Sequence, residues 1–557
     1  MCAACPVVDG VGRFLLHAPE ETVRDPIHDE RSHTSMADPT SSETSAYSSI
    51  PEALRRAETS VEPVRLSSVE IFPASMKRLG RRTYAAARLN GEPRLISAGT
   101  GPRARSGAAG GTIEPGAAGF DAPEHEVGGI HLQVVPIRTE HLHTLWELFP
   151  STRPRNLADV PATFGTGDRL GMANIGHVRA FRGSPARPVL AQQSVRELTQ
   201  TGRSFADVVA FAGYAVFREG YTAGFAADGD HLKRIADIAA SLDAGATMLT
   251  LDLSEALVPE AMLWSDADVS AAFKRLTTDQ RRPFETDYAG ARVELDGGVT
   301  TISESDAKRC AVVYAGAVEL ALEMREFISG HAGEVPHIEI SIDETSVPTE
   351  PTHHYMIVQE LVRRGCRPDS IAPRFIGEFQ KGIDYKGDLD TFAEQIRAHQ
   401  AVADAIGSYK LSIHSGSDKF SAYPAIAAAT RGRLHVKTSG TSWLEAVRTV
   451  AQVDPALYRE MHTVAVDVLE EMKALYHITP TVAGIVDPET LEDAELAGLM
   501  ESPDARQLLH VAYGKLLNHT DIGPRLWHTL QRSEGAYVDA VETHIRRHLR
   551  LLGLEGT

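Results

Sequence analysis

Apolar and polar residues alternate along three consecutive stretches between Arg374 and Trp443, and each stretch ends in a polar cluster. The stretches are FIGEFQKGIDY, YKLSIHSGSDKF and HVKTSGTSW. In the second, Ser412 and His414 alternate with Leu411, and a period of two is the pattern of a β-strand. A buried, hydrogen-bonded histidine would explain any one such strand. Three in succession favour an enzyme whose site lies where the strands end.

The chain from Ala162 onward repeats strand, polar loop and helix. The intervening helices carry apolar residues at i, i+3, i+4 and i+7, and several end at Gly. This order predicts an α/β fold, a (β/α)8 TIM-like barrel with its site at the C-terminal mouth. An open doubly wound sheet is the alternative, but no G-x-G-x-x-G follows a predicted strand. The predicted strands are Asp168–Ala173, Val189–Ser194, Thr222–Ala226, Thr247–Leu253, His337–Asp343, Ile371–Phe379, Tyr409–Ser415 and Arg433–Thr438.

Composition shifts divide the chain into four predicted segments. The first is rich in Ser, Thr, Asp, Glu and Pro, as in SHTSMADPTSSETSAYSS, which is typical of disorder. The last contains helical patterns only. The segments are a disordered tail at 1–45, a small N-terminal α/β unit at 46–155, a catalytic barrel at 156–451 with an insertion at 254–336 between its fourth and fifth strands, and a helical extension at 452–557.

Length and charge limit the class of protein. At 557 residues the chain should form more than one folding unit, and 43% hydrophobic with 24% charged residues is typical of a soluble globular protein. The net charge of −19 disfavours binding to nucleic acid or to an anionic membrane. No apolar run is long enough for a membrane span and no secretory signal is visible, so we expect a cytoplasmic protein. Reduced cysteines fit that compartment, since the four present are too scattered for a disulfide framework: Cys2, Cys5, Cys310 and Cys366.

Carboxylates lie at the ends of the fourth and fifth predicted strands. TMLTLDL brings Asp252 to the mouth, and HIEISIDETS places Glu339, Ser341 and Asp343 on one face. Buried polar groups are costly unless they are paired or bound to metal. A buried hydrogen-bond network would account equally well for Ser341 and Asp343. We predict that Asp252 and Glu339 are functional residues of the site.

Two further strand ends supply metal-ligand chemistry. Glu378 follows the sixth predicted strand and His414 ends the seventh. Together with Asp252 they offer the carboxylate and imidazole ligands of a divalent cation such as Mn, Ni, Co, Fe or Zn. The pair His353–His354 lies at a predicted helix start, and we expect it at the surface.

The loop after the eighth predicted strand has the chemistry of an anion site. Lys437 is followed by Ser439 and Thr441 and then by a helix N-terminus, which together offer a cation, hydroxyls and backbone N–H donors. A solvated loop is the alternative. Three further cations could add positive charge for the same substrate group: Arg169, Lys381 and Lys419.

These motifs resemble those of the tagaturonate epimerase family, which interconverts tagaturonate and fructuronate in bacterial hexuronate breakdown. The resemblance covers about residues 150–530, and it rests on the Asp252 strand and on FGTGDRLGMA, IEISIDETSVPTEPTHHY, RFIGEFQKGIDYKGDL, LSIHSGSDKFSAYP and LHVKTSGTSWLEA. It implies a metal-dependent isomerase, acid–base roles for Asp252 and Glu339, and a metal role for His414. Some members also epimerise the neutral ketohexoses fructose and tagatose.

The chemistry of these substrates restricts the mechanism. They differ at a carbinol carbon β to the ketone, which simple enolisation cannot invert. Retro-aldol cleavage and re-closure is favoured here over transient oxidation, since no nucleotide fingerprint is visible. A metal-dependent aldolase or ketose isomerase is the second enzymatic alternative, and a carbohydrate-binding barrel is the non-enzymatic one. The expected partner is a small sugar acid or ketohexose, and the insertion and helical extension are compatible with a homo-oligomer.

Overall fold

A closed barrel of eight parallel strands forms the centre of the molecule. The computed structural model describes residues 41–101, 119–295, 298–407, 409–438 and 440–556. The predicted (β/α)8 TIM-like barrel is confirmed by the closed order β10-β13-β14-β15-β16-β7-β8-β9. Its strands are β7 (Ala162–Gly165), β8 (Arg187–Ser194), β9 (Ala226–Leu232), β10 (Met248–Asp252), β13 (His337–Ser341), β14 (Ser370–Ala372), β15 (Lys410–Ile413) and β16 (Leu434–Lys437).

The parallel register brings polar side chains together inside the barrel. Thr250 of β10 is paired with Glu339 of β13, and Ser412 of β15 with His435 of β16. Their apolar neighbours, such as Ile340, are buried on the opposite face of the sheet against the surrounding helices. Because every strand runs in the same direction, the polar ends of all of them meet at one mouth.

Helices cover the barrel on its outside. Two of them begin at full capping boxes, since Ser194 caps α5 through Glu197 and Ser204 caps α6 through Asp207. The covering helices are α4 (Asn174–Ala180), α5 (Val195–Thr201), α6 (Phe205–Arg218), α7 (Ile235–Asp243), α10 (Glu304–His331), α11 (Pro351–Arg363), α12 (Leu389–Ile406), α13 (Tyr423–Thr430) and α14 (Thr441–Val453).

Two of the predicted strands were placed wrongly. The first strand is β7, and the stretch predicted in its place is a loop held by Asp168, whose carboxylate accepts backbone N–H groups of Leu170, Gly171 and Asn174. The third strand begins only at Ala226, where the prediction ended. Its sequence AADGDHL faces polar groups into the barrel and therefore lacks the apolar alternation on which the prediction depended.

The sixth predicted strand is also too long, because β14 ends at Ala372 and a loop follows it. The paired histidines His353 and His354, predicted at the surface, are fully buried in α11. His353 contacts Asp306 at 3.0 Å, and His354 contacts the ring of His399. Tertiary contacts with α10 and α12 cover both rings, and the local sequence carries no sign of those contacts.

A six-stranded antiparallel sheet precedes the barrel, in the order β1-β2-β3-β4-β6-β5. Helix α2 (Ser41–Ala57) packs on it, so helix already begins within the last residues of the predicted tail, whose residues 1–40 lie outside the described part. Glu534 of α20 (Glu534–Leu551) links this sheet to the rest of the molecule. Its carboxylate accepts hydrogen bonds from Arg88 of β3 at 3.2 Å and from Arg218 of α6 at 2.8 Å. The strands are β1 (Val64–Leu66), β2 (Val69–Leu79), β3 (Arg82–Leu89), β4 (Glu92–Gly99), β5 (Glu124–Val127) and β6 (Ile130–Pro136).

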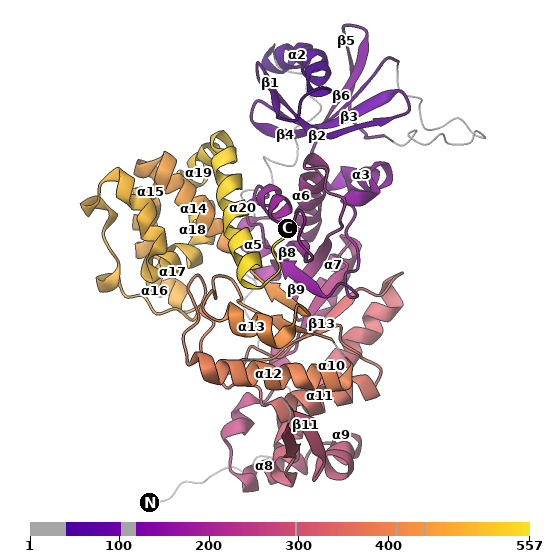
Figure 1. The fold of residues 1–557 in the computed structure, drawn as a ribbon, viewed down its shortest axis with the longest axis vertical. Helices are drawn as coiled ribbons and strands as arrows, with labels where there is room; N and C mark the ends of the chain where they lie inside the picture. The colour runs from indigo at the N-terminus through magenta and orange to yellow at the C-terminus, as the bar shows by residue number, and fades with distance from the viewer. Residues whose placement is uncertain (1–40, 102–118, 296–297, 408, 439, 557) are drawn as a thin grey trace, which may run out of the picture.

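Figure 1 shows the antiparallel sheet at one end of the molecule and the insertion at the other, with the C-terminal helices beside the barrel. The insertion contains α8 (Asp266–Phe273), α9 (Thr278–Pro283) and the hairpin of β11 (Arg292–Leu295) and β12 (Gly298–Thr301). The segment boundaries given above stay predictions. The C-terminal helices are α15 (Pro455–Asp467), α16 (Leu469–Lys473), α17 (Pro503–Val511), α18 (Tyr513–Leu517), α19 (Ile522–Arg532) and α20 (Glu534–Leu551).

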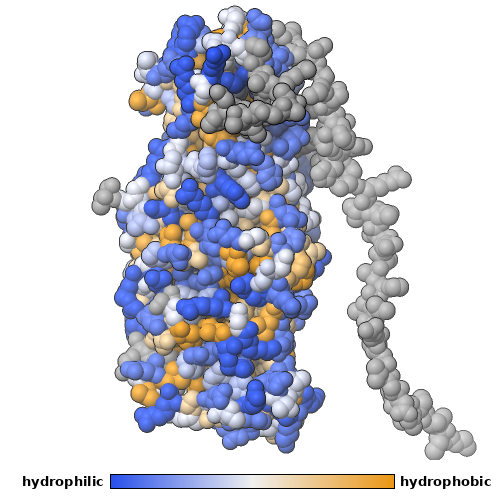
Figure 2. Space-filling model, turned by 90° about the vertical axis from the view of Figure 1, so that its right-hand side faces the viewer, coloured by the Kyte–Doolittle hydropathy of each residue, from blue (hydrophilic) through white to orange (hydrophobic). Residues whose placement is uncertain are grey.

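Hydrophilic side chains predominate on the face shown in Figure 2, and the apolar ones occur there as separate patches. Among the described residues, no helix has the length and apolar character needed to span a membrane.

Candidate active site

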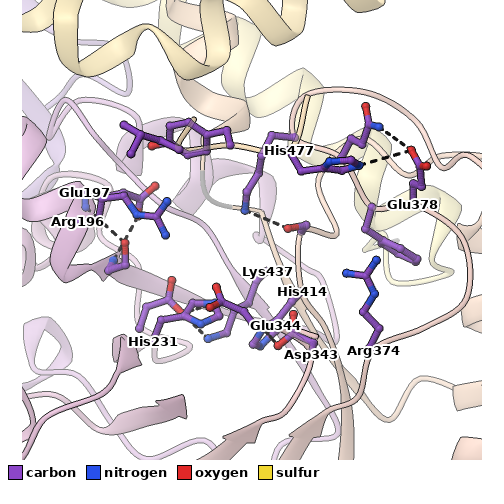
Figure 3. A pocket seen from close by; sticks show the side chains of 18 of the residues that line it. Arg196, Glu197, His231, Asp343, Glu344, Arg374, Glu378, His414, Lys437 and His477 are labelled. Carbon is purple, nitrogen blue, oxygen red and sulfur yellow. Dashed lines mark hydrogen bonds and ion pairs between the residues drawn. The ribbon is translucent and has the colours of Figure 1, made fainter. Parts of the chain in front are cut away.

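A cavity of about 450 Å³ opens at the C-terminal mouth of the barrel. Its lining comes from residues at or just beyond the ends of β8, β9, β13, β14, β15 and β16, and from the C-terminal segment around Tyr476. Figure 3 shows His231, Asp343, Glu344, His414 and Lys437 gathered on one side of this cavity. The cavity therefore lies at the mouth where the alternation of the strands predicts a site.

Lys437 is surrounded by three carboxylates at the floor of the cavity. Its Nζ lies 3.0 Å from Asp228 Oδ2, 2.6 Å from Asp230 Oδ1 and 3.0 Å from Glu339 Oε1, and it also contacts the hydroxyl of Thr250. Burial disfavours the charged amine, but the three carboxylates raise the pKa of Lys437 well above its ordinary value. The lysine is therefore held as an ammonium ion within a buried cluster of negative charge.

The carboxylates around Lys437 differ in their protonation. Burial raises the pKa of Asp228 to about 6, even though Lys437 opposes that shift. For Asp230, burial acts in the same direction, but the charge of Lys437 and that of His231 lower the pKa below its ordinary value. Asp230 lines the cavity and is ionised at neutral pH, so it has the position and the charge of a general base.

Two histidines at the mouth are each held by buried carboxylates. His414 Nε2 lies 2.8 Å from Glu339 Oε1, and its Nδ1 lies 3.0 Å from Asp343 Oδ1. His231 Nδ1 lies 3.3 Å from Asp252 Oδ2. Burial alone would lower the pKa of His414, but the charge of Asp343 and the contact with Glu339 raise it to about 10.

The mouth also contains a donor set that could hold a metal ion. One ligand atom each from His231, Asp252 and Glu344 lies within 4.8 Å of the others. Imidazole nitrogen and carboxylate oxygen suit a divalent transition metal or zinc. His414 adjoins this set, because its ring centroid is 4.9 Å from that of His231. The donor chemistry therefore fits a cation, with His231 in addition to the predicted Asp252 and His414.

The position of Glu378 does not favour its predicted role as a metal ligand. Its carboxylate accepts a hydrogen bond from Gln380 at 2.5 Å and lies 4.0 Å from His477 Nε2. The side chain is 47% exposed, and Figure 3 shows it with His477 at a distance from His231 and His414. Gly377, which has a φ of +84°, turns the chain out of line with β14 before Glu378 is reached.

Two of the predicted substrate-binding cations, Arg169 and Lys381, line the cavity. The guanidinium of Arg169 pairs with Glu197 at 2.8 Å and stacks 3.7 Å from the ring centre of Tyr513. Its buried Nη1 atom has no hydrogen-bond partner among the described residues. Lys381 Nζ donates to the hydroxyl of Ser415 at 3.0 Å, and burial lowers its pKa. Both cations keep donor capacity for an anionic ligand.

The other members of the predicted anion site are placed elsewhere. Lys419 Nζ donates to the carbonyl oxygens of Gln380, Ile383 and Ser417 at 2.7–2.9 Å, which anchors the loop after β14. The hydroxyl of Thr441 donates to Asp418 behind the cavity wall. Ser439 lies outside the described residues.

The surroundings of Lys437 do not favour its predicted role in binding the substrate carboxylate. Three carboxylates already occupy its ammonium group, and they would repel the carboxylate of a substrate.

Asp252 and Glu339 lie behind the histidines that line the cavity, so their position does not favour direct contact with a substrate. Neither belongs to the cavity lining among the described residues, and each is joined to a histidine that does. Asp228, Asp230 and His231 are not among the predicted site residues. The segment ADGDHLK, in which polar residues follow a short apolar start, was the available signal. That segment lies almost entirely in β9, beyond Ala226, where the third predicted strand ends.

Comparisons with known proteins show the family to which the chain belongs. A family model described as tagaturonate epimerase matches residues 114–552. The tagaturonate/fructuronate epimerase of Thermotoga maritima is 40% identical over 413 residues, which are 74% of this chain and 85% of that protein. The native crystal structure of fructuronate-tagaturonate epimerase from Cohnella laeviribosi is 38% identical with a TM-score of 0.83, and the match covers 92% of this chain and 99% of that one. Its complex with one glycerol matches with the same identity and TM-score, over 91% and 99%.

Proposed function

Because this chain belongs to the tagaturonate epimerase family, and is thus an epimerase, we propose that it interconverts tagaturonate and fructuronate in a metal-dependent reaction. One observation of the structure carries the proposal. A single cavity combines a cationic wall, which suits a sugar acid, with a floor of buried carboxylates, histidines and one lysine. That floor supplies the proton transfers and the metal ligands that epimerisation at an unactivated carbinol carbon requires.

The substrate carboxylate is assigned to Arg169 and Lys381. Arg169 offers the unpaired Nη1 donor, and Lys381 is held by a single neutral hydroxyl. Hydrogen bonds to charged groups are worth about 1.5–3 kcal/mol each. With the carboxylate end held at this wall, the carbinol end of the sugar would reach the floor around Lys437.

A divalent cation would be held by His231 and Asp252, with Glu344 and His414 next to them. Bound there, it would supply Lewis-acid stabilisation of negative charge on substrate oxygens. Glu339 orients the imidazole of His414 by accepting from its Nε2 atom, the usual task of a carboxylate behind a histidine ligand. This gives Glu339 a positioning role.

We assign the proton transfers to Asp230 and Lys437. Asp230 takes the proton of the hydroxyl β to the ketone, and the bond between the α and β carbons breaks. The electron pair of that bond forms a three-carbon enediolate, and the other fragment is a three-carbon aldehyde that keeps the carboxylate. When the aldehyde presents its other face, the bond re-forms with inverted configuration. Lys437 donates a proton to the new alkoxide and recovers one from Asp230, whose Oδ1 is 2.6 Å away.

The activity is tested by incubating the metal-loaded enzyme with tagaturonate alone and resolving the products. Fructuronate should accumulate to a constant ratio, and the same ratio should be reached from fructuronate. Accumulation of three-carbon fragments without epimer would identify an aldolase, and an aldose product would identify a ketose isomerase.

The mechanism is tested with substrate deuterated at the β carbon. Retro-aldol cleavage leaves that C–H bond intact, so the labelled and unlabelled substrates should react at closely similar rates. Transient oxidation breaks the same bond, and a clearly slower labelled substrate would therefore replace retro-aldol with oxidation.

A further inference from the structure

A second cluster of metal-ligand residues lies outside the active-site cavity, where α20 packs beside the loop that follows β15. Asp418 comes from that loop, and His544 and His548 come from α20. One ligand atom of each lies within 4.8 Å of the others, and none of the three lines the cavity. We infer that these residues form a structural divalent-cation site of the zinc type, separate from the catalytic one.

The spacing of the two histidines suits such a site. Residues four apart lie on the same face of a helix, so both rings of the HIRRH segment point toward the barrel. His544 Nε2 is 2.7 Å from Asp418 Oδ1, and His548 Nε2 is 3.7 Å from the same oxygen. The hydroxyl of Thr441 lies 2.6 Å from His544 Nε2. Two imidazoles and a carboxylate are three ligands of the kinds that zinc binds.

The remaining nitrogen of each ring faces an acceptor. His548 Nδ1 lies 2.8 Å from the backbone oxygen of His544, and His544 Nδ1 lies 3.5 Å from Glu445 Oε1. Metal-bound histidines typically donate their second N–H to a carbonyl or carboxylate, which fixes the other nitrogen toward the ion. Here that arrangement turns both Nε2 atoms toward Asp418. Glu445 Oε1 is buried without a hydrogen-bond partner among the described residues.

A proton is the competing occupant of the cluster. With His544 protonated, its Nε2–H could donate to Asp418, and His548 Nε2 accepts the backbone N–H of Asp418 at 3.1 Å. Arg506, 2.8 Å from Asp418 Oδ2, supplies part of the positive charge in either case. The cation is favoured because one ligand atom from each of the two histidines and one from Asp418 lie within 4.8 Å of one another.

A cation at this site would fasten α20 to the loop of β15. Asp418 follows the candidate metal ligand His414 by four positions, so the cluster would hold one side of the mouth in place. Its loss should therefore lower the melting temperature while the catalytic groups stay intact.

The test counts cations in the full-length enzyme. Chelator-stripped wild type, titrated with Co²⁺ alone, should bind two ions per chain. His548→Gln should bind one, remain active and lose part of the cation-induced rise in melting temperature. A double variant, His231→Ala with His414→Ala, leaves the second cluster unaltered and should bind one ion with the visible absorption of tetrahedral Co²⁺, although it is inactive.

The result of the double variant decides the question even if His548→Gln fails to fold. Absence of bound Co²⁺ in it would overturn the inference, and the cluster would then be held by a proton. Unchanged stoichiometry in a folded His548→Gln protein would overturn it as well. Failure of the catalytic metal proposal looks different, because the double variant would then bind as many ions as wild type.

Discussion

His231 and His414 face each other at the mouth of the barrel, with ring centroids 4.9 Å apart and ring planes inclined by 69°. His231 lies in β9 and His414 directly follows β15, so two separate strands bring the rings together. Each ring is hydrogen-bonded to a buried carboxylate, His231 to Asp252 and His414 to Glu339. This relationship underlies the predictions on metal binding.

Replacing either histidine should remove the catalytic cation. We expect His231→Ala and His414→Ala to lose one equivalent of metal and nearly all activity while keeping the fold, because His231 belongs to the donor set and His414 adjoins it. Elemental analysis and circular dichroism check both points. Glu378→Gln is the matched control, since Glu378 pairs with His477, and it should keep full metal occupancy. Full occupancy in both histidine variants would place the metal elsewhere.

Asp230→Asn should lower the turnover number by on the order of 10²-fold or more, because the amide cannot accept the hydroxyl proton. The Michaelis constant should change less, since Asp230 acts on the reacting hydroxyl. Steady-state kinetics separate the two effects. Asp237→Asn, on the outer helix α7, serves as a surface control. Near wild-type turnover in Asp230→Asn would assign the base to another group, with Asp343 the next candidate.

Lys437→Met should impair epimerisation of tagaturonate and of fructose to similar extents. It removes the ammonium ion shared by Asp228, Asp230 and Glu339, and it leaves their charges buried without a partner. Breaking a buried ion pair in this way typically costs about 3–5 kcal/mol of stability. Chemical denaturation measures that cost. A loss confined to tagaturonate would restore Lys437 as the residue that grips the substrate carboxylate.

Arg169→Met should penalise tagaturonate much more than fructose, which has no carboxylate to hold. Loss of a charged hydrogen bond worth about 1.5–3 kcal/mol corresponds to roughly a ten- to hundred-fold fall in kcat/KM. Arg196→Met is the control, because Arg196 lines the same cavity but lies 5.4 Å from the ring centre of Tyr476. Equal losses on both substrates would show that Arg169 acts through Glu197 on the fold.

Metal affinity should rise with pH up to about pH 10. In the cation-free enzyme the pKa of His414 is raised to about 10, so a proton occupies this ligand at neutral pH. The protonated ring contributes stability that is fully present below its unfolded pKa of 6.5 and is lost as the pH rises through about 10. A cation must displace that proton, which makes binding stronger as the pH increases. Calorimetric titrations at several pH values test this, and pH-independent affinity would exclude His414 as a ligand.

Strands with regular alternation were predictable because their signal is local. β13, β15 and β16 lie within their predicted ranges, since Ile338, Leu411 and Val436 alternate with polar residues that face the interior. β9 was misplaced because its own interior residues are Asp and His. The two aspartates of β9 are paired with Lys437 of β16, which is distant from them in the sequence.

The sequence by itself therefore determined the barrel, the mouth at which its polar residues gather, and the family to which the chain is similar. Tertiary structure alone decided which groups meet there. Lys437 is separated from Asp228 and Asp230 by 209 and 207 residues, yet the closed barrel brings their charged atoms within 3.0 Å. Alternation along a strand reports which face a side chain occupies, but the partner across the barrel depends on closure and register. For that reason Lys437 could be predicted to be functional, while the carboxylates that pair with it could not.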